Sequence, residues 1–159
     1  MKKKYPHFPT ITTLCYILNG NNEVLLSMKK RGVGVGRWNG QGGKVKEGES
    51  LEGSVIREVE EETGLKVANL INRGVLEFVA PEKPEIQSRR HIFITKDYEG
   101  NIIETEECYS KWHKLDKLPL NEMWDDDVIW LEKLLVEEKE VRYRFFLNQD
   151  EKLEKHEEI

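Results

Sequence analysis

The chain has 159 residues, of which 38% are hydrophobic and 35% are charged. This length can bury a sizeable core, and we expect a single domain over residues 1–159 with a charged, frayed tail from about residue 150. The net charge of −5 argues against a broad surface for a nucleic-acid polymer or an anionic membrane. No feature of the sequence sets an oligomeric state, and a monomer is the working expectation.

The cysteines and the first residues bear on the cellular compartment. Cys15 and Cys108 show no paired spacing, which fits a reduced, cytoplasmic protein. Residues 1–6 are basic, but they lead into a stretch that polar residues interrupt and that soon reaches a turn. This pattern is not typical of a signal peptide or of a membrane-spanning helix.

A β-hairpin is expected first along the chain. Ile11–Leu18 is rich in β-branched and apolar side chains, and Glu23–Met28 can pair back on it. Between them lies the segment Asn19–Asn22, whose residue types tolerate the positive φ angles of a tight turn. The sequence therefore predicts two antiparallel strands.

A glycine-rich segment follows from Lys29 to Gly43, with six glycines between residues 32 and 43. It is either a flexible connection or one wall of a substrate site whose backbone amides face phosphate oxygens. The cations available to phosphate oxygens in this segment are Lys29, Lys30, Arg31 and Arg37. The second interpretation is favoured because the segment leads directly into an acidic helix.

That helix is short and amphipathic, and Gly64 is expected to end it. Glu58, Glu61 and Glu62 fall within roughly a quarter of a turn at about 100° per residue. The neighbouring arc is apolar and should face a core; it contains Leu51, Val55, Ile56 and Val59. The helix therefore presents one acidic stripe beside one apolar stripe.

Three carboxylates so close together need a positive partner. Arg57 lies four residues before Glu61 and can pair with it, whereas Glu60 points away and is expected on the surface. Oxygen ligands without a nearby Cys or His favour Mg²⁺ or Mn²⁺ over zinc. An acidic surface helix with one Arg–Glu pair is the simpler alternative, but it leaves the flanking glycines unexplained.

The rest of the chain is expected to add strands and a second helix. Alternating or apolar stretches predict one or two strands in Leu65–Ala80 and further strands at His91–Lys96, Lys111–Leu115 and Val141–Leu147. Asn121–Glu137 has apolar residues at helical spacing and predicts the helix. Many strands with two helices to cover them predict an α/β fold, a mixed β-sheet with helices on its faces.

The stretch from Gly43 to Leu65 resembles the signature of the Nudix hydrolases. That signature is Gly, five residues, Glu, seven residues, Arg-Glu, an apolar residue, any residue, Glu-Glu, any residue, Gly and an apolar residue. The matching residues are Gly43, Glu49, Arg57, Glu58, Val59, Glu61, Glu62, Gly64 and Leu65. So many constrained positions make this motif far more specific than a lone glycine-rich loop. The resemblance implies the Nudix α/β/α sandwich and hydrolysis of a phosphoanhydride with Mg²⁺ or Mn²⁺.

The same resemblance implies roles for individual residues. The implied metal ligands are Glu58, Glu61, Glu62 and the carbonyl of Gly43. Glu61 or Glu62 is expected to orient or deprotonate the attacking water, and Arg57 belongs to the catalytic set. A further ligand or base is expected from a loop outside the signature. Glu107 is the choice there, with Glu104 and Glu106 as alternatives.

Three segments outside the signature are similar to the MutT-type oxidised purine nucleoside triphosphate hydrolases. They are Met28–Val45, Gly74–Val79 and Met123–Asp127. This resemblance implies a substrate site made of Lys29, Asn39, Trp124, Asp126 and Asp127, with the Trp124 ring stacked on the purine. An amide offers both a donor and an acceptor, and a partly buried carboxyl group can hold a proton. Such groups can read the altered edge of an 8-oxopurine, while an aromatic face holds the ring.

The chain departs from that pattern at three positions. Val33 and Leu76 stand where such enzymes tend to carry phenylalanine, and Asp125 stands where proline is usual. Asp125 also suits the cap at the start of the second helix. The departures leave the preference among 8-oxo-dGTP, 2-hydroxy-dATP and unmodified nucleotides open.

The leading hypothesis is Mg²⁺-dependent hydrolysis of an oxidised purine nucleoside triphosphate to the monophosphate and pyrophosphate, which would sanitise the nucleotide pool. The enzymatic alternative is another Nudix substrate, such as a dinucleoside polyphosphate, ADP-ribose or an RNA 5′ end. A different class is a Nudix-like module that senses a nucleotide without cutting it. The intact glutamates of the signature argue against that module.

Overall fold

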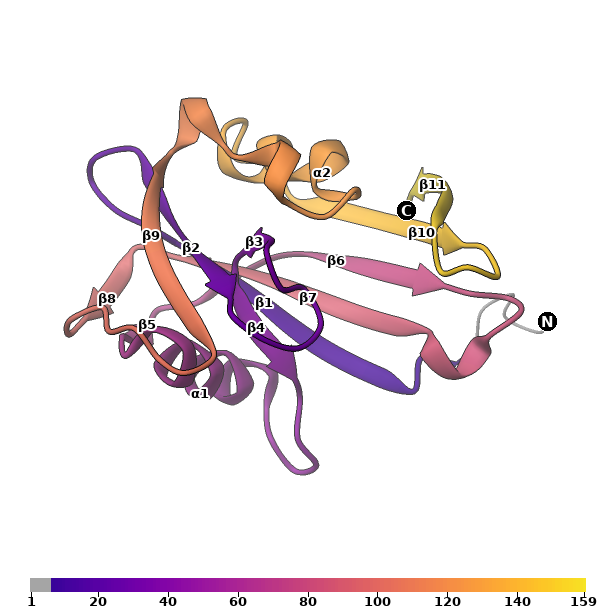
Figure 1. The fold of residues 1–159 in the computed structure, drawn as a ribbon, viewed down its shortest axis with the longest axis horizontal. Coiled ribbons are helices and arrows are strands. Elements are labelled where there is room, and N and C mark those ends of the chain that lie inside the picture. The colour runs from indigo at the N-terminus through magenta and orange to yellow at the C-terminus, as the bar shows by residue number, and fades with distance from the viewer. Residues whose placement is uncertain (1–6) are drawn as a thin grey trace.

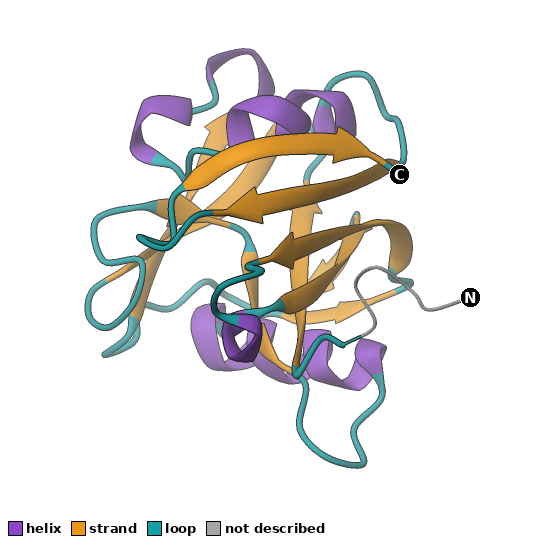
Figure 2. Ribbon diagram, turned by 90° about the vertical axis from the view of Figure 1, so that its right-hand side faces the viewer, coloured by secondary structure: helices purple, strands orange, loops and turns teal. Residues whose placement is uncertain are grey.

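The structure, a computed structural model, describes residues 7–159, so the basic segment of residues 1–6 lies outside the described part. The described residues form a mixed β-sheet with one α-helix against each face (Figures 1 and 2). The strand order in the main sheet is β11-β10-β6-β7-β1-β2-β3, with β4 paired to β1 and β9 paired to β2. This arrangement confirms the predicted α/β sandwich.

The strands of the main sheet are β1 (Thr10–Leu18), β2 (Glu23–Lys29), β3 (Trp38–Asn39), β4 (Gln41–Lys44), β6 (Ile71–Val79), β7 (Ser88–Thr95), β9 (Cys108–Lys114), β10 (Val141–Leu147) and β11 (Leu153–Glu158). A small second sheet pairs β5 (Lys66–Ala68) with β8 (Asp97–Glu99). The α-helices are α1 (Leu51–Thr63) and α2 (Asp127–Leu135), and short 3₁₀ turns cover Pro84–Ile86, Leu115–Lys117 and Leu120–Glu122.

Strand β1 is buried on both faces and divides the core in two. Leu14 and Tyr16 belong to the cluster on the α2 side, while Cys15 and Ile17 belong to the cluster on the α1 side. Successive side chains of a strand point to opposite faces, so one apolar run serves both layers. Cys15 is fully buried, as expected of a small core residue.

The apolar stripe of α1 is narrower than predicted. Val55 and Val59 are fully buried, but Ile56 is 40% exposed. At about 100° per residue, Ile56 lies about 60° outside the arc that Val55 and Val59 share, whereas Glu62 lies only about 20° outside it. The prediction for Ile56 was therefore wrong, and a carboxylate occupies part of the buried face. Glu60 is exposed, as predicted.

Two elements differ from the sequence prediction in their extent. The glycine-rich segment contains β3 and β4, and β4 runs antiparallel to β1 with Gly43 opposite Thr13. The second helix was predicted from Asn121, but α2 begins at Asp127, because a 3₁₀ turn and an extended Met123 precede it. Trp124 therefore lies on a connecting segment before α2.

The predicted frayed tail was wrong, because β11 pairs antiparallel with β10. Buried Glu77 of β6 accepts hydrogen bonds from Arg89 and Arg144, and Arg144 also reaches Glu157 of β11. Strand β11 consists mainly of charged residues, so its sequence lacks the alternation of apolar and polar residues that predicts a strand. Its order comes from this ion-pair network and from the backbone ladder, which a hydrophobic pattern does not report.

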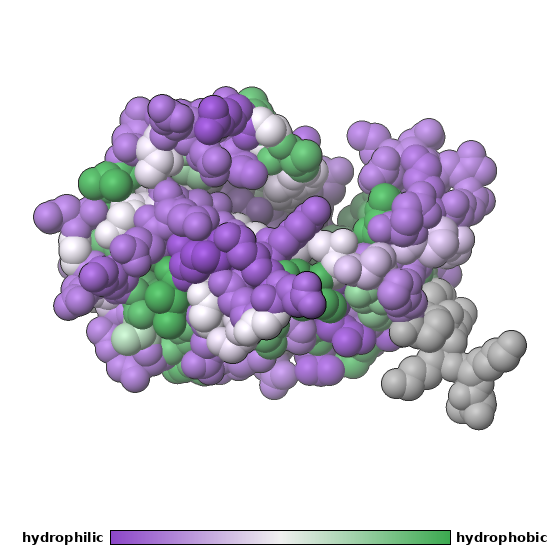
Figure 3. Space-filling model, turned by 90° about the horizontal axis from the view of Figure 1, so that it is seen from below, coloured by the Kyte–Doolittle hydropathy of each residue, from purple (hydrophilic) through white to green (hydrophobic). Residues whose placement is uncertain are grey.

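No helix of the described residues is long and apolar enough to cross a membrane. The face in Figure 3 is largely hydrophilic and carries only small, separate hydrophobic patches. That surface agrees with a chain in which 35% of the residues are charged.

Candidate active site

Local interactions fix both ends of α1. The Ser50 side chain accepts a hydrogen bond from the Gly53 backbone N–H, which caps the first turn. Gly64 ends the helix in the left-handed conformation, with φ 83°, and its N–H bonds to the Glu60 carbonyl. A Cβ atom on Gly64 would also lie 2.7 Å from Ile103. The predicted helix end at Gly64 is therefore confirmed, whereas the cap at Ser50 was not predicted.

Arg57 organises the acidic groups beside α1. Its Nε and Nη2 donate to the two oxygens of Glu49 at 2.7 and 2.9 Å, and its Nη1 donates to Glu58 at 2.8 Å. The predicted contact with Glu61 is longer, at 3.4 Å. Glu49 is therefore the main partner of Arg57, which sequence spacing on the helix alone did not indicate.

The Arg57–Glu49 pair is held from both sides. The Lys46 backbone N–H donates to Glu49 at 3.0 Å, and Arg57 also donates to the Lys44 carbonyl at 3.2 Å. The hydrogen bond from Arg57, followed by that from Lys46, lowers the pKa of Glu49 to about 2. Glu49 therefore stays ionised at neutral pH and anchors the loop before α1 to the guanidinium.

Glu58 and Glu62 lie against the glycines of β4. The Gly42 N–H donates to Glu62 at 3.0 Å, and a Cβ atom on Gly43 would lie only 2.6 Å from the Glu58 carboxylate. Gly42 itself faces the Thr13 carbonyl, which a Cβ atom would meet at 1.9 Å. Because these glycines have no side chain, the two carboxylates and strand β1 can lie in direct contact with the backbone of β4.

The Glu62 carboxylate is the one that is short of positive charge, because Arg57 pairs with Glu58. Burial raises the pKa of Glu58. Burial and then the charge of Glu58 raise the pKa of Glu62 to about 8. A buried carboxylate without a cation is costly, so this pair favours an added positive charge.

The donor set fits a hard cation. The carboxylate oxygens of Glu58 and Glu62 lie beside Gly42 and Gly43, and Glu61, with a side chain 55% exposed, lies at the solvent edge. Within residues 7–159, no group of three Asp, Glu, His or Cys side chains is already gathered closely enough to hold a metal ion. Arg57 contacts both Glu58 and Glu61 at this edge.

The loop before β9 brings a further carboxylate towards this pair. The charge of Glu107 contributes to the raised pKa of both Glu58 and Glu62. Its carbonyl accepts a hydrogen bond from the Lys30 N–H at 2.7 Å, and its side chain lies 3.7 Å from Arg31. Glu107 is therefore placed within electrostatic reach of the signature glutamates.

The alternatives to Glu107 are paired with the glycine-rich segment. Glu104 forms an ion pair with Lys30, and Glu106, whose side chain is 90% exposed, lies 3.8 Å from Arg31. These pairs also engage two of the cations that were predicted to face phosphate oxygens. Glu107 also lies near Arg31, so ion pairing does not separate it from Glu106, and the choice of Glu107 stays a prediction.

A cleft of about 310 Å³ opens beside the carboxylates, between β1, β4 and the glycine-rich segment. It brings together Lys29, Asn39, Gly43, Glu62 and Trp124, all predicted site residues. The Asn39 side-chain oxygen accepts a hydrogen bond from the Gly40 N–H at 2.9 Å. Residues distant in sequence therefore share one cavity with the acidic helix.

A neighbouring cavity of about 420 Å³ extends the cleft towards α2. The two cavities share Val33, Arg37, Arg90 and Trp124. Val33 is 81% exposed at this entrance, while a second departure, Leu76, is fully buried in the core. Leu76 therefore contributes to core packing and does not line either cavity.

The acidic residues near Trp124 have distinct positions. Asp125 and Asp126 line the neighbouring cavity, and Asp126 accepts a hydrogen bond from the Trp130 indole at 2.9 Å. Asp127 is 2% exposed and accepts from the Trp124 backbone N–H at 3.0 Å. Asp126 occupies the N-cap position, so the expected cap at Asp125 was wrong. The cap has no side-chain hydrogen bond.

Two arginines near the cleft were not among the predicted base-pocket residues. Arg37 donates to the Met123 carbonyl at 2.8 Å, and its guanidinium lies 4.8 Å from the centre of the Trp124 ring. Arg90 of β7 faces both cavities. Only the pairing of β7 with β1, which places Arg90 opposite Thr12, brings it there. No local motif could have indicated that pairing.

The comparisons with known proteins agree with this architecture. A NUDIX domain model matches residues 8–134. The chain is 43% identical to the oxidized purine nucleoside triphosphate hydrolase of Mus musculus and 41% identical to that of Danio rerio, in each case over 127 residues, 80% of this chain and 81% of the relative. The crystal structure of the MutT protein of Bacillus halodurans superposes with a TM-score of 0.76 at 26% identity, covering 93% of this chain and 96% of that one.

An acidic helix that faces a glycine-walled cleft on a mixed sheet is the arrangement expected of a Nudix hydrolase. With the match over residues 8–134, this chain belongs to the Nudix family. The resemblance stated from the signature residues is thereby confirmed.

Proposed function

We propose that this protein hydrolyses oxidised purine nucleoside triphosphates such as 8-oxo-dGTP to the monophosphate and pyrophosphate, which removes them from the nucleotide pool. One observation carries the proposal. A single cleft contains the signature carboxylate Glu62, the amide Asn39 and the indole Trp124. Two relatives more than 40% identical to the chain bear the name of this activity.

We infer that Mg²⁺, or Mn²⁺, is the cofactor. The residues that would hold it are Glu58, Glu61, Glu62 and the Gly43 carbonyl. When bound, such an ion neutralises phosphate charge and lowers the pKa of water. The raised pKa of Glu62 supports this assignment, since a cation would offset the unfavourable burial of its charge.

The reaction needs a water oxygen to attack phosphorus while the α–β phosphoanhydride bond breaks and pyrophosphate leaves. The water gives up one proton to a carboxylate, for which Glu61 and Glu62 are the candidates and Glu107 is the loop alternative. Arg57 acts by holding Glu58 in place through the contacts already described. Lys29, on the wall of the cleft, offers its ammonium to phosphate oxygens.

The base would lie between Asn39 and Trp124. The Trp124 ring supplies a face for stacking, and Asn39 supplies a donor and an acceptor. Asp126 borders the adjoining cavity, so its carboxylate can accept a hydrogen bond from the altered edge of the purine. Asp127, being buried, contributes by accepting a hydrogen bond from the Trp124 backbone N–H.

We further propose that residues 1–159 act as one domain and as a monomer in the cytoplasm. The described surface in Figure 3 lacks a broad hydrophobic patch on the face shown. Cys15 and Cys108 are buried and free, which suits a reducing compartment. We expect no membrane and no nucleic-acid polymer as partners. Size-exclusion chromatography with light scattering tests the monomer, and a mass near 37 kDa (twice 18.7 kDa) would contradict it.

The activity is tested by incubating the protein with Mg²⁺ and a panel of nucleotides and by resolving the products. The panel contains 8-oxo-dGTP, 2-hydroxy-dATP, dGTP, a dinucleoside polyphosphate, ADP-ribose and a 5′-triphosphate RNA. Preferential release of pyrophosphate from an oxidised purine nucleotide is the expected result. Selective cleavage of a dinucleotide, ADP-ribose or RNA, or tight binding without turnover, would contradict the proposal.

A further inference from the structure

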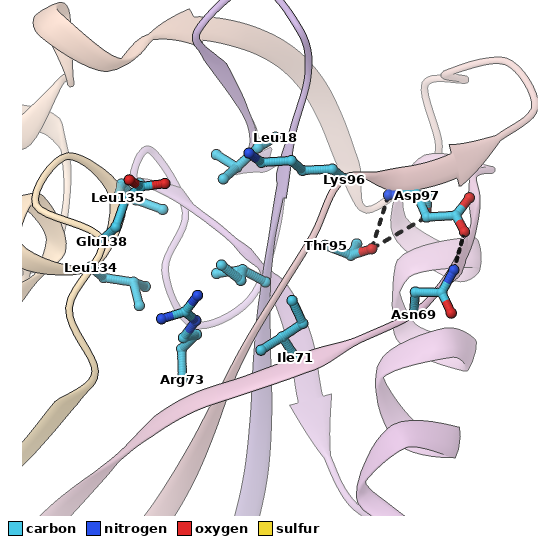
Figure 4. A pocket seen from close by; sticks show the side chains of 11 residues that line it. Leu18, Asn69, Ile71, Arg73, Thr95, Lys96, Asp97, Leu134, Leu135 and Glu138 are labelled. Atoms are coloured by element: carbon cyan, nitrogen blue, oxygen red, sulfur yellow. Dashed lines mark hydrogen bonds between the residues drawn. The ribbon is translucent and has the colours of Figure 1, made fainter.

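A third cavity of about 450 Å³, the distal cavity, lies at the opposite end of the central strand β1 (Figure 4). Leu18, at the end of β1, lines it, whereas the cleft contacts Thr12 and Thr13 near the start of that strand. Six strand residues separate Leu18 from Thr12, a distance of roughly 20 Å. The distal cavity shares no lining residue with the two cavities of the candidate active site.

The walls of the distal cavity are mainly apolar. Branched aliphatic side chains from the sheet and from the end of α2 form them: Leu18, Ile71, Ile94, Leu134 and Leu135. A volume of this size accommodates a small organic molecule. An apolar body would gain by leaving water for these walls.

Arg73 enters this apolar space because of a β-bulge. The pairing of β6 with β7 shifts between Asn72 and Gly74, so Arg73 has no partner across the ladder. The Asn72 side chain accepts from the Gly74 N–H at 3.0 Å, which braces the bulge. Gly74 has φ 149°, and a Cβ atom there would lie 1.8 Å from the Val141 carbonyl. Bulges of this kind redirect a side chain and recur beside functional sites.

The Arg73 guanidinium is incompletely paired. Its Nε is buried and has no hydrogen-bond partner among residues 7–159. Figure 4 shows the guanidinium between Leu134 and Ile71, directed into the cavity. A buried donor left without an acceptor is destabilising, and native proteins keep few of them. An acceptor supplied by a ligand would relieve that cost.

The other charged groups at the cavity leave the arginine available. Asp97 accepts a hydrogen bond from the Asn69 side chain, and Lys96 extends across the cavity towards Leu18 (Figure 4). Glu138 is exposed at the rim, where it takes a left-handed conformation with φ 54°. The inner part of the cavity therefore combines one guanidinium, one ammonium at its edge and apolar walls.

We propose that this distal cavity binds a small organic anion. Its anionic oxygens would accept hydrogen bonds from Arg73, and its apolar body would lie against Leu134 and Leu135. A planar guanidinium suits a carboxylate or a phosphate, because it offers parallel N–H donors. This site is separate from the hydrolytic cleft and does not depend on the proposed substrate.

The test measures binding of octanoate and of octyl phosphate to the full chain by isothermal titration calorimetry, with 1-octanol as the uncharged probe. We expect both anions to bind and octanol to bind at least tenfold more weakly. Arg73→Gln should weaken anion binding about tenfold or more, in line with the loss of a charge-assisted hydrogen bond. Arg142→Gln, an exposed arginine on β10, is the matched control and should leave the affinity unchanged.

Amide chemical shifts of the isotope-labelled wild type locate the site even if the Arg73 variant folds poorly. Shifts confined to the backbone around Arg73, Lys96 and Leu135 are expected when octanoate is added. Shifts centred on Asn39 and Trp124, equal affinity for octanol, or no binding at millimolar octanoate would overturn the proposal. Hydrolysis of 8-oxo-dGTP is read separately, so failure of the distal site leaves the proposed activity standing.

Discussion

The Arg57 guanidinium holds the Glu49 carboxylate through two hydrogen bonds, Nε to Oε2 at 2.7 Å and Nη2 to Oε1 at 2.9 Å. Glu49 lies on the loop before α1, and Arg57 lies within the helix, so this contact ties the loop to the helix. The remaining Arg57 nitrogen donates to Glu58 at 2.8 Å. The Glu49–Arg57 pair therefore positions a carboxylate of the candidate metal site.

Glu49→Gln should lower kcat for 8-oxo-dGTP by about 10–100-fold, the range seen when groups that support metal ligands are lost. A neutral amide cannot hold the guanidinium as firmly, so Glu58 would lose its fixed position. The Mg²⁺ concentration needed for half-maximal rate should rise as well. Glu60→Gln, on the exposed side of α1, is the control. Equal kinetics for the two variants would contradict the positioning role.

Gly42→Ala should destabilise the protein by about 3 kcal/mol, which is at the severe end of single substitutions. Its Cβ atom would lie 1.9 Å from the Thr13 carbonyl, so β4 could not pair with β1 as it does. Urea unfolding measures the change. Gly20→Ala is the matched control, because nothing lies within 4 Å of a Cβ atom there. An unchanged unfolding midpoint for Gly42→Ala would refute this packing.

Gly43→Ala should separate activity from stability. Its Cβ atom would lie 2.6 Å from the Glu58 carboxylate, which can swing aside because it is the end of a flexible side chain. We expect a loss of stability below about 1 kcal/mol but a fall in kcat of at least tenfold. Chemical denaturation and steady-state kinetics on the same preparation give both numbers. A variant with full kcat would show that the Glu58 position does not matter.

The Asp127 carboxyl group should make stability depend on pH. Burial and the charge of Asp126 raise its pKa from 3.8 to about 8. The folded state then binds a proton that the unfolded state has released, so this stabilisation is complete below about pH 4 and is lost as the pH rises to about 8. The free energy of unfolding should fall by up to about 1.4 kcal/mol per pH unit in this window.

Asp127→Asn isolates that contribution, because an amide does not titrate. Urea unfolding of wild type and variant between pH 4 and pH 8 should show the steeper decline in the wild type. Asp125→Asn is the control, since this exposed neighbour should leave the slope unchanged. Parallel curves for wild type and Asp127→Asn would mean that Asp127 is ionised in the folded protein.

The signature could be read from the sequence because its parts are local. Gly64 and the carboxylates of α1 lie within one short segment, and helical periodicity sets the directions of the carboxylates. Helical periodicity could not predict the contact between Arg57 and Glu49, because Glu49 lies on the loop before the helix. Spacing along the helix therefore led to Glu61 as the expected partner.

The remaining features depend on contacts between distant segments. Arg90 reaches the cleft only through the parallel pairing of β7 with β1. Val128 continues the helical spacing from Trp124 yet is 59% exposed, because it lies at the edge of the arc that buries Trp130, Leu131 and Leu134. Strand β11 is charged along its length and depends on β10 for its partner. No pattern within a single segment records such pairings.

In the proposed reaction, the α1 carboxylates support hydrolysis of a nucleotide whose base lies between Asn39 and Trp124. The most direct measurement compares kcat and the dissociation constant for 8-oxo-dGTP in Glu58→Gln and Trp124→Ala. Glu58→Gln should lose at least 100-fold in kcat while its affinity, measured without turnover in Ca²⁺, changes less than about threefold. Trp124→Ala should lose affinity by about tenfold or more, in line with the loss of a stacked aromatic face. Full turnover in Glu58→Gln, or unchanged affinity in Trp124→Ala, would contradict the account.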